Sequence, residues 1–237
     1  MVILRGEGIT KRFGGLYALS NVTFEVYKNE IFGIIGPNGS GKTTLFNVIT
    51  GIYLPDAGKI EFLGRSIKGL PPHKICRMGM ARAYQIPRPF PRLTVLENLL
   101  VASISSQNMK YADALEYDME VLKLLKIENL KDVPAGSLLP FQLKRLEIAR
   151  ALACKPKLLL LDEPAAGMRE EEIDYLAEVI KKVSGTGITI VLVEHRMELI
   201  TRVADRVMFM HRGMKLFEGA PKDVLSSKEV VDIYLGG

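Results

Sequence analysis

The sequence has few cysteines and no long apolar run, and both absences exclude classes of protein. Its 237 residues include two cysteines, Cys76 and Cys154, which stand apart without the spacing of a metal site. This usage is typical of a reduced, cytosolic setting and not of a disulfide-stabilised secreted domain. No apolar run approaches the roughly 18 residues that a membrane-spanning helix needs. Residues 1–7 have neither the basic start nor the long apolar stretch of a signal peptide.

The net charge is also small. The formal net charge is +5, and the Lys and Arg residues are scattered along the chain rather than clustered. A small excess of basic residues, scattered along the chain, is typical of a solvated surface and argues against a nucleic-acid partner. The hydrophobic share of 48% and the charged share of 25% are those of an ordinary globular protein. The length suits one large core, or a core with a subdomain set into it.

The most informative stretch fits the phosphate-binding pattern G-x-x-x-x-G-K-[ST]. It consists of Gly36, Pro37, Asn38, Gly39, Ser40, Gly41, Lys42, Thr43 and Thr44. A short buried strand is predicted just before it and a helix just after it, so a chance glycine-rich turn is the poorer interpretation. The glycines let the backbone N–H groups form a concave anion site at the helix N-terminus. We expect Lys42 to reach the outer phosphates of a nucleoside triphosphate and the Thr43 hydroxyl to bind Mg²⁺.

The remaining pattern predicts an α/β chain. Alternation over residues 2–30 predicts two or three antiparallel strands before the phosphate-binding loop. Residues 158–161 are all leucine, and residues 188–193 are apolar except for Thr189, which is typical of central parallel strands buried on both faces. Two further strands are predicted at 207–210 and 215–218.

Between the loop and these strands the sequence turns helical. Residues 88–135 carry helical spacing with a capping box that starts at Thr94, and residues 141–153 carry it again. We therefore predict a single nucleotide-binding domain, 1–237, with a helical subdomain of approximately 88–153 inserted in its core.

One buried strand ends in a pair of acids, Asp162 and Glu163. The carboxyl edge of an open α/β sheet is where such sheets place their sites. We expect Asp162 to hold Mg²⁺ through a water molecule and Glu163 to accept a proton from a water that attacks the γ-phosphate. A solvent-facing strand end would show the same acids, but the phosphate-binding loop favours the functional interpretation.

Two further side chains follow predicted strands. His195 falls at the matching edge of strand 188–193, within plausible reach of the γ-phosphate, although a surface histidine would give the same pattern. Gln85 could bind Mg²⁺ or position the water, and its spacing alone does not separate these roles from an ordinary polar loop residue.

In order and spacing, these motifs resemble the ATP-binding-cassette (ABC) ATPases over nearly the whole chain. The finer likeness is to the branched-chain amino-acid uptake subgroup, and it rests on residues 13–19, 81–85, 93–99, 145–152 and 162–167. The resemblance implies an α/β fold: a RecA-like P-loop NTPase core, an N-terminal antiparallel β subdomain and an inserted helical subdomain.

The resemblance also implies roles for single residues. Phe13 would stack on adenine, Gln85 and the segment after it would sense the membrane subunit, Glu163 would be the catalytic base and His195 the switch histidine. The helical subdomain would rotate on ATP binding, and its cleft would receive a coupling helix of a permease.

The implied function is ATP hydrolysis, with Mg²⁺, that drives import of branched-chain or related amino acids. The chain would lie at the cytoplasmic face of the membrane, held there by permease subunits and paired with a second ABC ATPase subunit. One alternative is a soluble ABC protein that acts as a scaffold or nucleic-acid machine, which typically carries two cassettes or a long coiled-coil insertion. The other is a catalytically weak regulatory cassette, which the intact Lys42, Glu163 and His195 disfavour.

One segment departs from the family pattern. The signature Leu-Ser-Gly-Gly-Gln aligns with residues 138–142, where Leu139 replaces the serine that bonds the opposite subunit's γ-phosphate and Phe141 replaces a glycine. Loss of a charged hydrogen bond costs about 1.5–3 kcal/mol, whereas Pro140 suits the first turn of the helix that follows. Arg169 also stands where the family usually has Asp or Asn. Either the chain pairs with a different ATPase subunit, or a homodimer works slowly.

Overall fold

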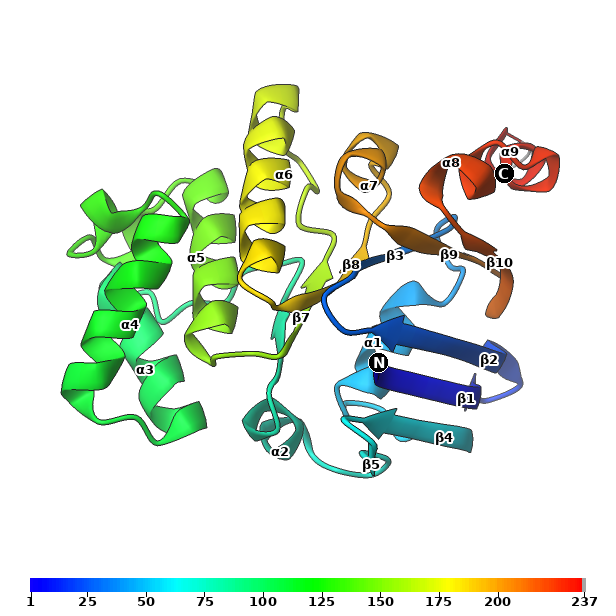
Figure 1. Ribbon diagram of the computed structural model, residues 1–237, viewed down its shortest axis with the longest axis horizontal. Coiled ribbons are helices and arrows are strands. Elements are labelled where there is room, and N and C mark those ends of the chain that lie inside the picture. The colour runs from blue at the N-terminus through cyan, green and yellow to red at the C-terminus, as the bar shows by residue number, and fades with distance from the viewer. Residues whose placement is uncertain (236–237) are drawn as a thin grey trace.

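The computed structural model describes residues 1–235, which form two sheets with helices packed on and between them (Figure 1). The smaller sheet is antiparallel, in the order β2-β1-β4-β5. Its strands are β1 (Val2–Phe13), β2 (Leu16–Tyr27), β4 (Ala57–Phe62) and β5 (Arg65–Ser66). The N-terminal antiparallel part of the expected fold is therefore confirmed.

The larger sheet has the strand order β10-β9-β3-β8-β7-β6, with all pairs parallel except β10 with β9. Its strands are β3 (Ile31–Ile35), β6 (Met80–Ala83), β7 (Leu158–Asp162), β8 (Thr189–Val193), β9 (Arg206–His211) and β10 (Met214–Gly219). The register places Ala83 beside Leu161 and Asp162 beside Val193. The carboxyl ends of β6, β7 and β8 are therefore level, and the loops that follow them leave the sheet together.

The leucine run of β7 is apolar on both faces because the sheet is covered on both faces. Leu159 and Leu161 belong to a core with the helices α5 (Pro140–Ala153), α6 (Glu170–Gly185) and α7 (Met197–Val203). Leu158 and Leu160 belong to a second core with α1 (Lys42–Ile49) and the antiparallel sheet. Figure 1 shows this layering, with α6 and α7 on one side of the larger sheet and α1 on the other.

A group of helices lies to one side of the larger sheet, next to β6 and β7 (Figure 1). It comprises α3 (Val95–Gln107), α4 (Tyr111–Leu124), the short 3₁₀ helices at Glu128–Leu130 and Ala135–Ser137, and α5. The capping box at the start of α3 forms as the sequence predicts, because the Thr94 hydroxyl accepts from Glu97 N–H and the Glu97 carboxylate accepts from Thr94 N–H.

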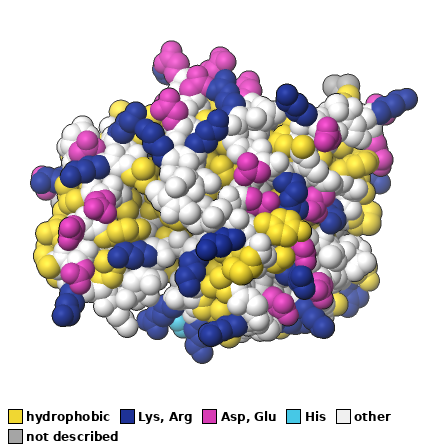
Figure 2. Space-filling view, viewed as in Figure 1, with side chains coloured by type: hydrophobic (Ala, Val, Ile, Leu, Met, Phe, Trp, Pro, Cys, Tyr) yellow, Lys and Arg dark blue, Asp and Glu magenta, His cyan; other side chains and the backbone are white. Residues whose placement is uncertain are grey.

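Three short helices complete the described chain, namely α2 (Pro72–Arg77), α8 (Pro221–Leu225) and α9 (Lys228–Leu235). Helix α2 was not predicted from the sequence, because it lies in a polar, proline-rich stretch, and it begins with proline at its first position. Within residues 1–235 no helix has the length and apolar character to cross a membrane. Figure 2 shows basic and acidic side chains interspersed over the face drawn there.

Candidate nucleotide-binding and hydrolysis site

The loop between β3 and α1 needs glycine at two positions. Gly36 has φ +146°, and a Cβ there would lie 2.1 Å from the Met210 carbonyl oxygen. Gly41 has φ +103°, and a Cβ there would lie 2.5 Å from the Ala18 carbonyl oxygen. Since α1 begins directly after Gly41, the first N–H groups of this helix have no helical acceptor. The loop therefore leaves backbone N–H groups open at the start of α1, where the sequence predicts an anion site, and α1 begins at Lys42 rather than at Thr44.

Lys42 is folded back onto this loop and is only 4% exposed. Its Nζ donates to the carbonyl oxygens of Gly36 and Pro37, both at 2.8 Å, and to Ser40 Oγ at 3.3 Å. Burial lowers the pKa of Lys42 to about 8, and the nearby carboxylates of Glu163 and Asp162 oppose that change without cancelling it. The ammonium is thus held at the cradle by dipoles, ready for an anionic ligand.

A cavity of about 640 Å³ opens beside the loop. Residues 38–44 form one wall, and residues 15–18, Glu163, His195 and Arg212 form the rest. Phe13, expected to stack on adenine, is not in this wall; its half-exposed ring packs edge-on against Tyr53, with the centroids 5.3 Å apart. Tyr17 lines the cavity instead, with the Arg12 guanidinium 5.5 Å from its ring centroid. The sequence analysis did not single out Tyr17 or Arg212.

Three of the predicted residues converge at the sheet edge. Glu163, which directly follows β7, accepts a hydrogen bond from Gln85 Nε2 at Oε2 and lies 2.7 Å from His195 Nε2 through Oε1. Glu163 takes the left-handed conformation, φ +44°, and its N–H donates to the carbonyl of Val193 at 2.9 Å. Its carboxylate is thereby aimed between the loops that follow β6 and β8.

Glu194 fixes the loops around this carboxylate, and the sequence analysis gave it no role. It is 1% exposed. One carboxylate oxygen accepts from Ala165 N–H at 2.8 Å, and the other accepts from the N–H groups of His195 and Arg196 at 2.7 and 2.9 Å. A buried carboxylate needs such donors, so a glutamate directly after the apolar run 190–193 was the signal for this role.

Asp162 ends β7 and is buried, with its Oδ2 ion-paired to Arg82 Nη2 at 2.5 Å. Asp162 and Gln85 line a second cavity, of about 460 Å³. The Gln85–Glu163 hydrogen bond joins this cavity to the one beside the phosphate-binding loop. All the predicted site residues other than Phe13 therefore lie on the loop or at the carboxyl edge of the sheet.

This geometry agrees with comparisons to known proteins. The pattern of the ABC transporter family matches residues 19–166. The chain belongs to the ABC transporter family. It is 38% identical to the high-affinity branched-chain amino acid transport ATP-binding protein BraF of Pseudomonas aeruginosa, over 99% of this chain and 98% of that protein. It is 39% identical to a probable branched-chain amino acid transport ATP-binding protein, LivG, of Archaeoglobus fulgidus, over 100% and 96% of the two chains.

Solved ABC cassettes share the fold. The ADP conformation of an ATP-binding cassette of an ABC transporter superposes with a TM-score of 0.91 at 37% identity, and each chain covers 100% of the other. A dimeric cassette in a post-hydrolysis state with ADP and phosphate gives a TM-score of 0.83 at 25% identity, over 92% of this chain and 99% of that one. The expected α/β ABC fold is confirmed, and the chain is an ATPase that binds adenine nucleotide.

Residues 138–142, which differ from the family's signature, lie at the start of helix α5. Leu139, at the N-cap of α5, is 65% exposed. The Phe141 ring packs edge-on against Tyr175 of α6, with centroids 5.8 Å apart, and the Arg145 guanidinium lies 5.4 Å from the Phe141 centroid. The segment and the loop before α6, which includes Arg169, border one cavity of about 470 Å³. The aromatic ring is thus part of the α5–α6 packing.

Proposed function

We propose that this ABC cassette is the ATP-hydrolysing subunit of an importer for branched-chain or related amino acids. The full-length likeness to transport proteins named for branched-chain amino acids supports the substrate class. The single observation that carries the activity is the Glu163 carboxylate, held between Gln85 and His195 at the edge of the cavity that the phosphate-binding loop lines.

The loop binds the phosphates of ATP. Backbone N–H groups of residues 39–44 donate to phosphate oxygens, and Lys42 exchanges its carbonyl acceptors for the β- and γ-phosphates. Tyr17 and Leu16 are placed to contact the base side of the cavity. Phe13 is assigned to adenine by the family resemblance alone.

The oxygen donors at the sheet edge fit Mg²⁺. Thr43, on α1, offers a hydroxyl, Asp162 a carboxylate and Gln85 an amide oxygen, since it is the Nε2 of Gln85 that binds Glu163. Hard oxygen ligands with one carboxylate, completed by substrate phosphates, are what Mg²⁺ takes in nucleotide sites. When bound, the cation neutralises charge that develops on the phosphates.

Glu163 acts as the general base. It accepts a proton from the water that attacks the γ-phosphate, while the Gln85 and His195 side chains hold its two oxygens in place. An ionised Glu163 carboxylate can only accept, so in the 2.7 Å contact between His195 Nε2 and Glu163 Oε1 the nitrogen is the donor when Glu163 acts as the base. Glu194 keeps His195 in position through the backbone.

A second cassette completes the site. In this chain Leu139 and Phe141 cannot provide the hydroxyl and the bare backbone of a regular signature, so we assign the partner as a different ATPase subunit with an intact signature. Permease subunits hold the pair peripherally at the cytoplasmic face of the membrane, with a coupling helix in the cleft beside the helical subdomain, approximately 88–153.

The test is reconstitution of the chain with its permeases, a solute-binding protein and a second cassette in vesicles. ATP supplied on the side of the vesicle membrane where the cassettes lie should drive uptake of labelled leucine. It should not drive uptake of a charged amino acid, which serves as the control. Uptake that persists with Glu163→Gln, or a chain that co-purifies only with partners lacking membrane segments, would contradict the proposal.

A further inference from the structure

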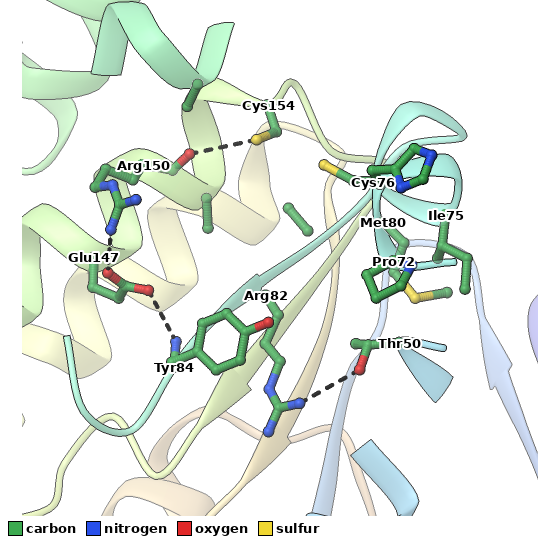
Figure 3. A pocket seen from close by; sticks show the side chains of 14 residues that line it. Thr50, Pro72, Ile75, Cys76, Met80, Arg82, Tyr84, Glu147, Arg150 and Cys154 are labelled. Carbon is green, nitrogen blue, oxygen red and sulfur yellow. Dashed lines mark hydrogen bonds and ion pairs between the residues drawn. The ribbon is translucent and has the colours of Figure 1, made fainter. Parts of the chain in front are cut away.

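Arg82 is a buried arginine that the proposed mechanism does not use. Its side chain is 5% exposed and crosses the wall of a cavity of about 310 Å³ between α2, β6 and α5 (Figure 3). The guanidinium stacks over two rings, with its carbon 4.7 Å from the Tyr84 centroid and 5.4 Å from the Phe46 centroid. Contact with two rings limits the orientations of the guanidinium, so its N–H groups can point in few directions.

Each arm of this fork reaches a different element of the site. Nη2 donates to Asp162 Oδ2 at 2.5 Å, at the end of β7. Nη1 donates to Asn47 Oδ1 at 2.8 Å and to Thr50 Oγ1 at 3.4 Å, at the far end of the helix that starts at Lys42. Arg82 itself lies on β6, three residues before Gln85. One side chain therefore connects the helix of the phosphate-binding loop with two strands that lead to predicted Mg²⁺ ligands.

The two oxygens of Asp162 have different surroundings. Oδ2 is taken by Arg82, whereas no side chain or backbone group in residues 1–235 donates a hydrogen bond to Oδ1. Because Oδ2 is fixed, rotation of the carboxylate is restricted and Oδ1 keeps its lone pairs in one direction. A carboxylate prepared in this way suits a cation with strict octahedral geometry.

We infer that Arg82 is a positioning residue that holds Asp162 so that one carboxylate oxygen is presented to the Mg²⁺ of bound Mg·ATP. This inference rests on the proposed metal role of Asp162. The shape of the guanidinium is what positions Asp162. A lysine ammonium at the same place could pair with Asp162, but it could not also bond Asn47 and lie against two rings.

The test measures nucleotide binding with and without the metal. Calorimetry with a non-hydrolysable ATP analogue, in Mg²⁺ and then in EDTA, gives the factor by which Mg²⁺ strengthens binding. Arg82→Lys and Arg82→Gln should each lower this factor by about 10–100-fold, the usual cost of losing an outer partner of a metal ligand. Binding in EDTA should stay as in the wild type, because the loop itself is untouched.

Arg206 offers a matched control. Like Arg82, it carries a guanidinium that lies over two rings, here Tyr27 and Phe32, and it bonds two carboxylates, Glu30 and Glu218, at the amino end of β9. Arg206→Lys should lower the melting temperature as Arg82→Lys does and leave the Mg²⁺ factor unchanged. A loss with Arg206→Lys as well would show a general structural effect and overturn the inference.

The other outcomes are equally decisive. If Mg²⁺ strengthened binding by the wild-type factor in Arg82→Lys, or by a larger factor in Arg82→Gln, Arg82 would act by its charge alone. Either result would overturn the positioning role. If Arg82→Lys does not fold, Asn47→Ala, which removes only one acceptor of the fork, should lower the factor several-fold, and no change would refute the inference. Asp162→Asn tests the metal role of Asp162 separately from the positioning role of Arg82. An unchanged Mg²⁺ factor in Asp162→Asn would refute the metal role of Asp162 itself.

Discussion

Binding of ATP should make the protein take up a proton through Lys42 near pH 8. In the nucleotide-free chain burial lowers the pKa of this ammonium to about 8, with only carbonyl and hydroxyl oxygens as acceptors. The phosphates of ATP bring several negative charges to Nζ and raise the pKa again. At pH 8 half of the molecules hold neutral Lys42, so binding should take up about 0.5 proton, against about 0.1 at pH 7.

The uptake is measured by titration calorimetry at pH 8 in buffers with different ionisation enthalpies. The slope of the observed enthalpy against the buffer's ionisation enthalpy gives the number of protons. Lys42→Arg is the control, since a guanidinium stays protonated and should give a slope near zero. A zero slope for the wild type at pH 8, with ATP bound, would show that Lys42 is fully charged in the empty loop and refute the reasoning.

The same lowered pKa affects stability. Between about pH 8 and the ordinary value of 10.5, the folded nucleotide-free chain binds fewer protons at Lys42 than the unfolded chain does. The contribution of this residue to the free energy of unfolding therefore rises with pH across that window. Saturating ATP should abolish this rise, which thermal unfolding at a series of pH values can follow.

Three further outcomes follow from the structure. Glu163→Gln should lower ATP turnover, measured by phosphate release, by about 10²–10⁴-fold while ATP still binds, and retained turnover would remove Glu163 as the base. Leu139→Ser combined with Phe141→Gly should raise the ATPase activity of the isolated chain, and no gain would show that the signature does not limit this activity. The same double change should lower the free energy of unfolding in urea by at least roughly 0.5–1.5 kcal/mol, because the ring pair between Phe141 and Tyr175 is lost. The neighbouring Cys76 thiol lowers the pKa of Cys154, so iodoacetamide at pH 7.5 should modify Cys154 before Cys76, and peptide mapping that finds the reverse order would contradict this.

Several parts of the site could be predicted from the sequence because they are local. The loop 36–44 is recognisable since its glycines are required by φ values and by close backbone contacts that no side chain allows. The run that ends in Asp162 is recognisable because a strand buried on both faces must be apolar. The start of α3 is recognisable because Thr94 and Glu97 cap it within one turn. In each case the residues that show the pattern are neighbours along the chain, even where, as at Gly36 and Gly41, the contact that requires it comes from a distant segment.

Other parts depend on the tertiary structure, because their partners are far apart in the chain. Arg82 meets Asp162 across 80 residues, and Gln85 meets Glu163 across 78. The sequence alone predicted that Gln85, Glu163 and His195 follow strands, and the parallel register decided that these strand ends are level and that the three side chains touch. Only packing decided that Arg82 bonds Asp162 and that Tyr17, rather than Phe13, lines the cavity, since propensity and periodicity describe neighbours along the chain and not across it.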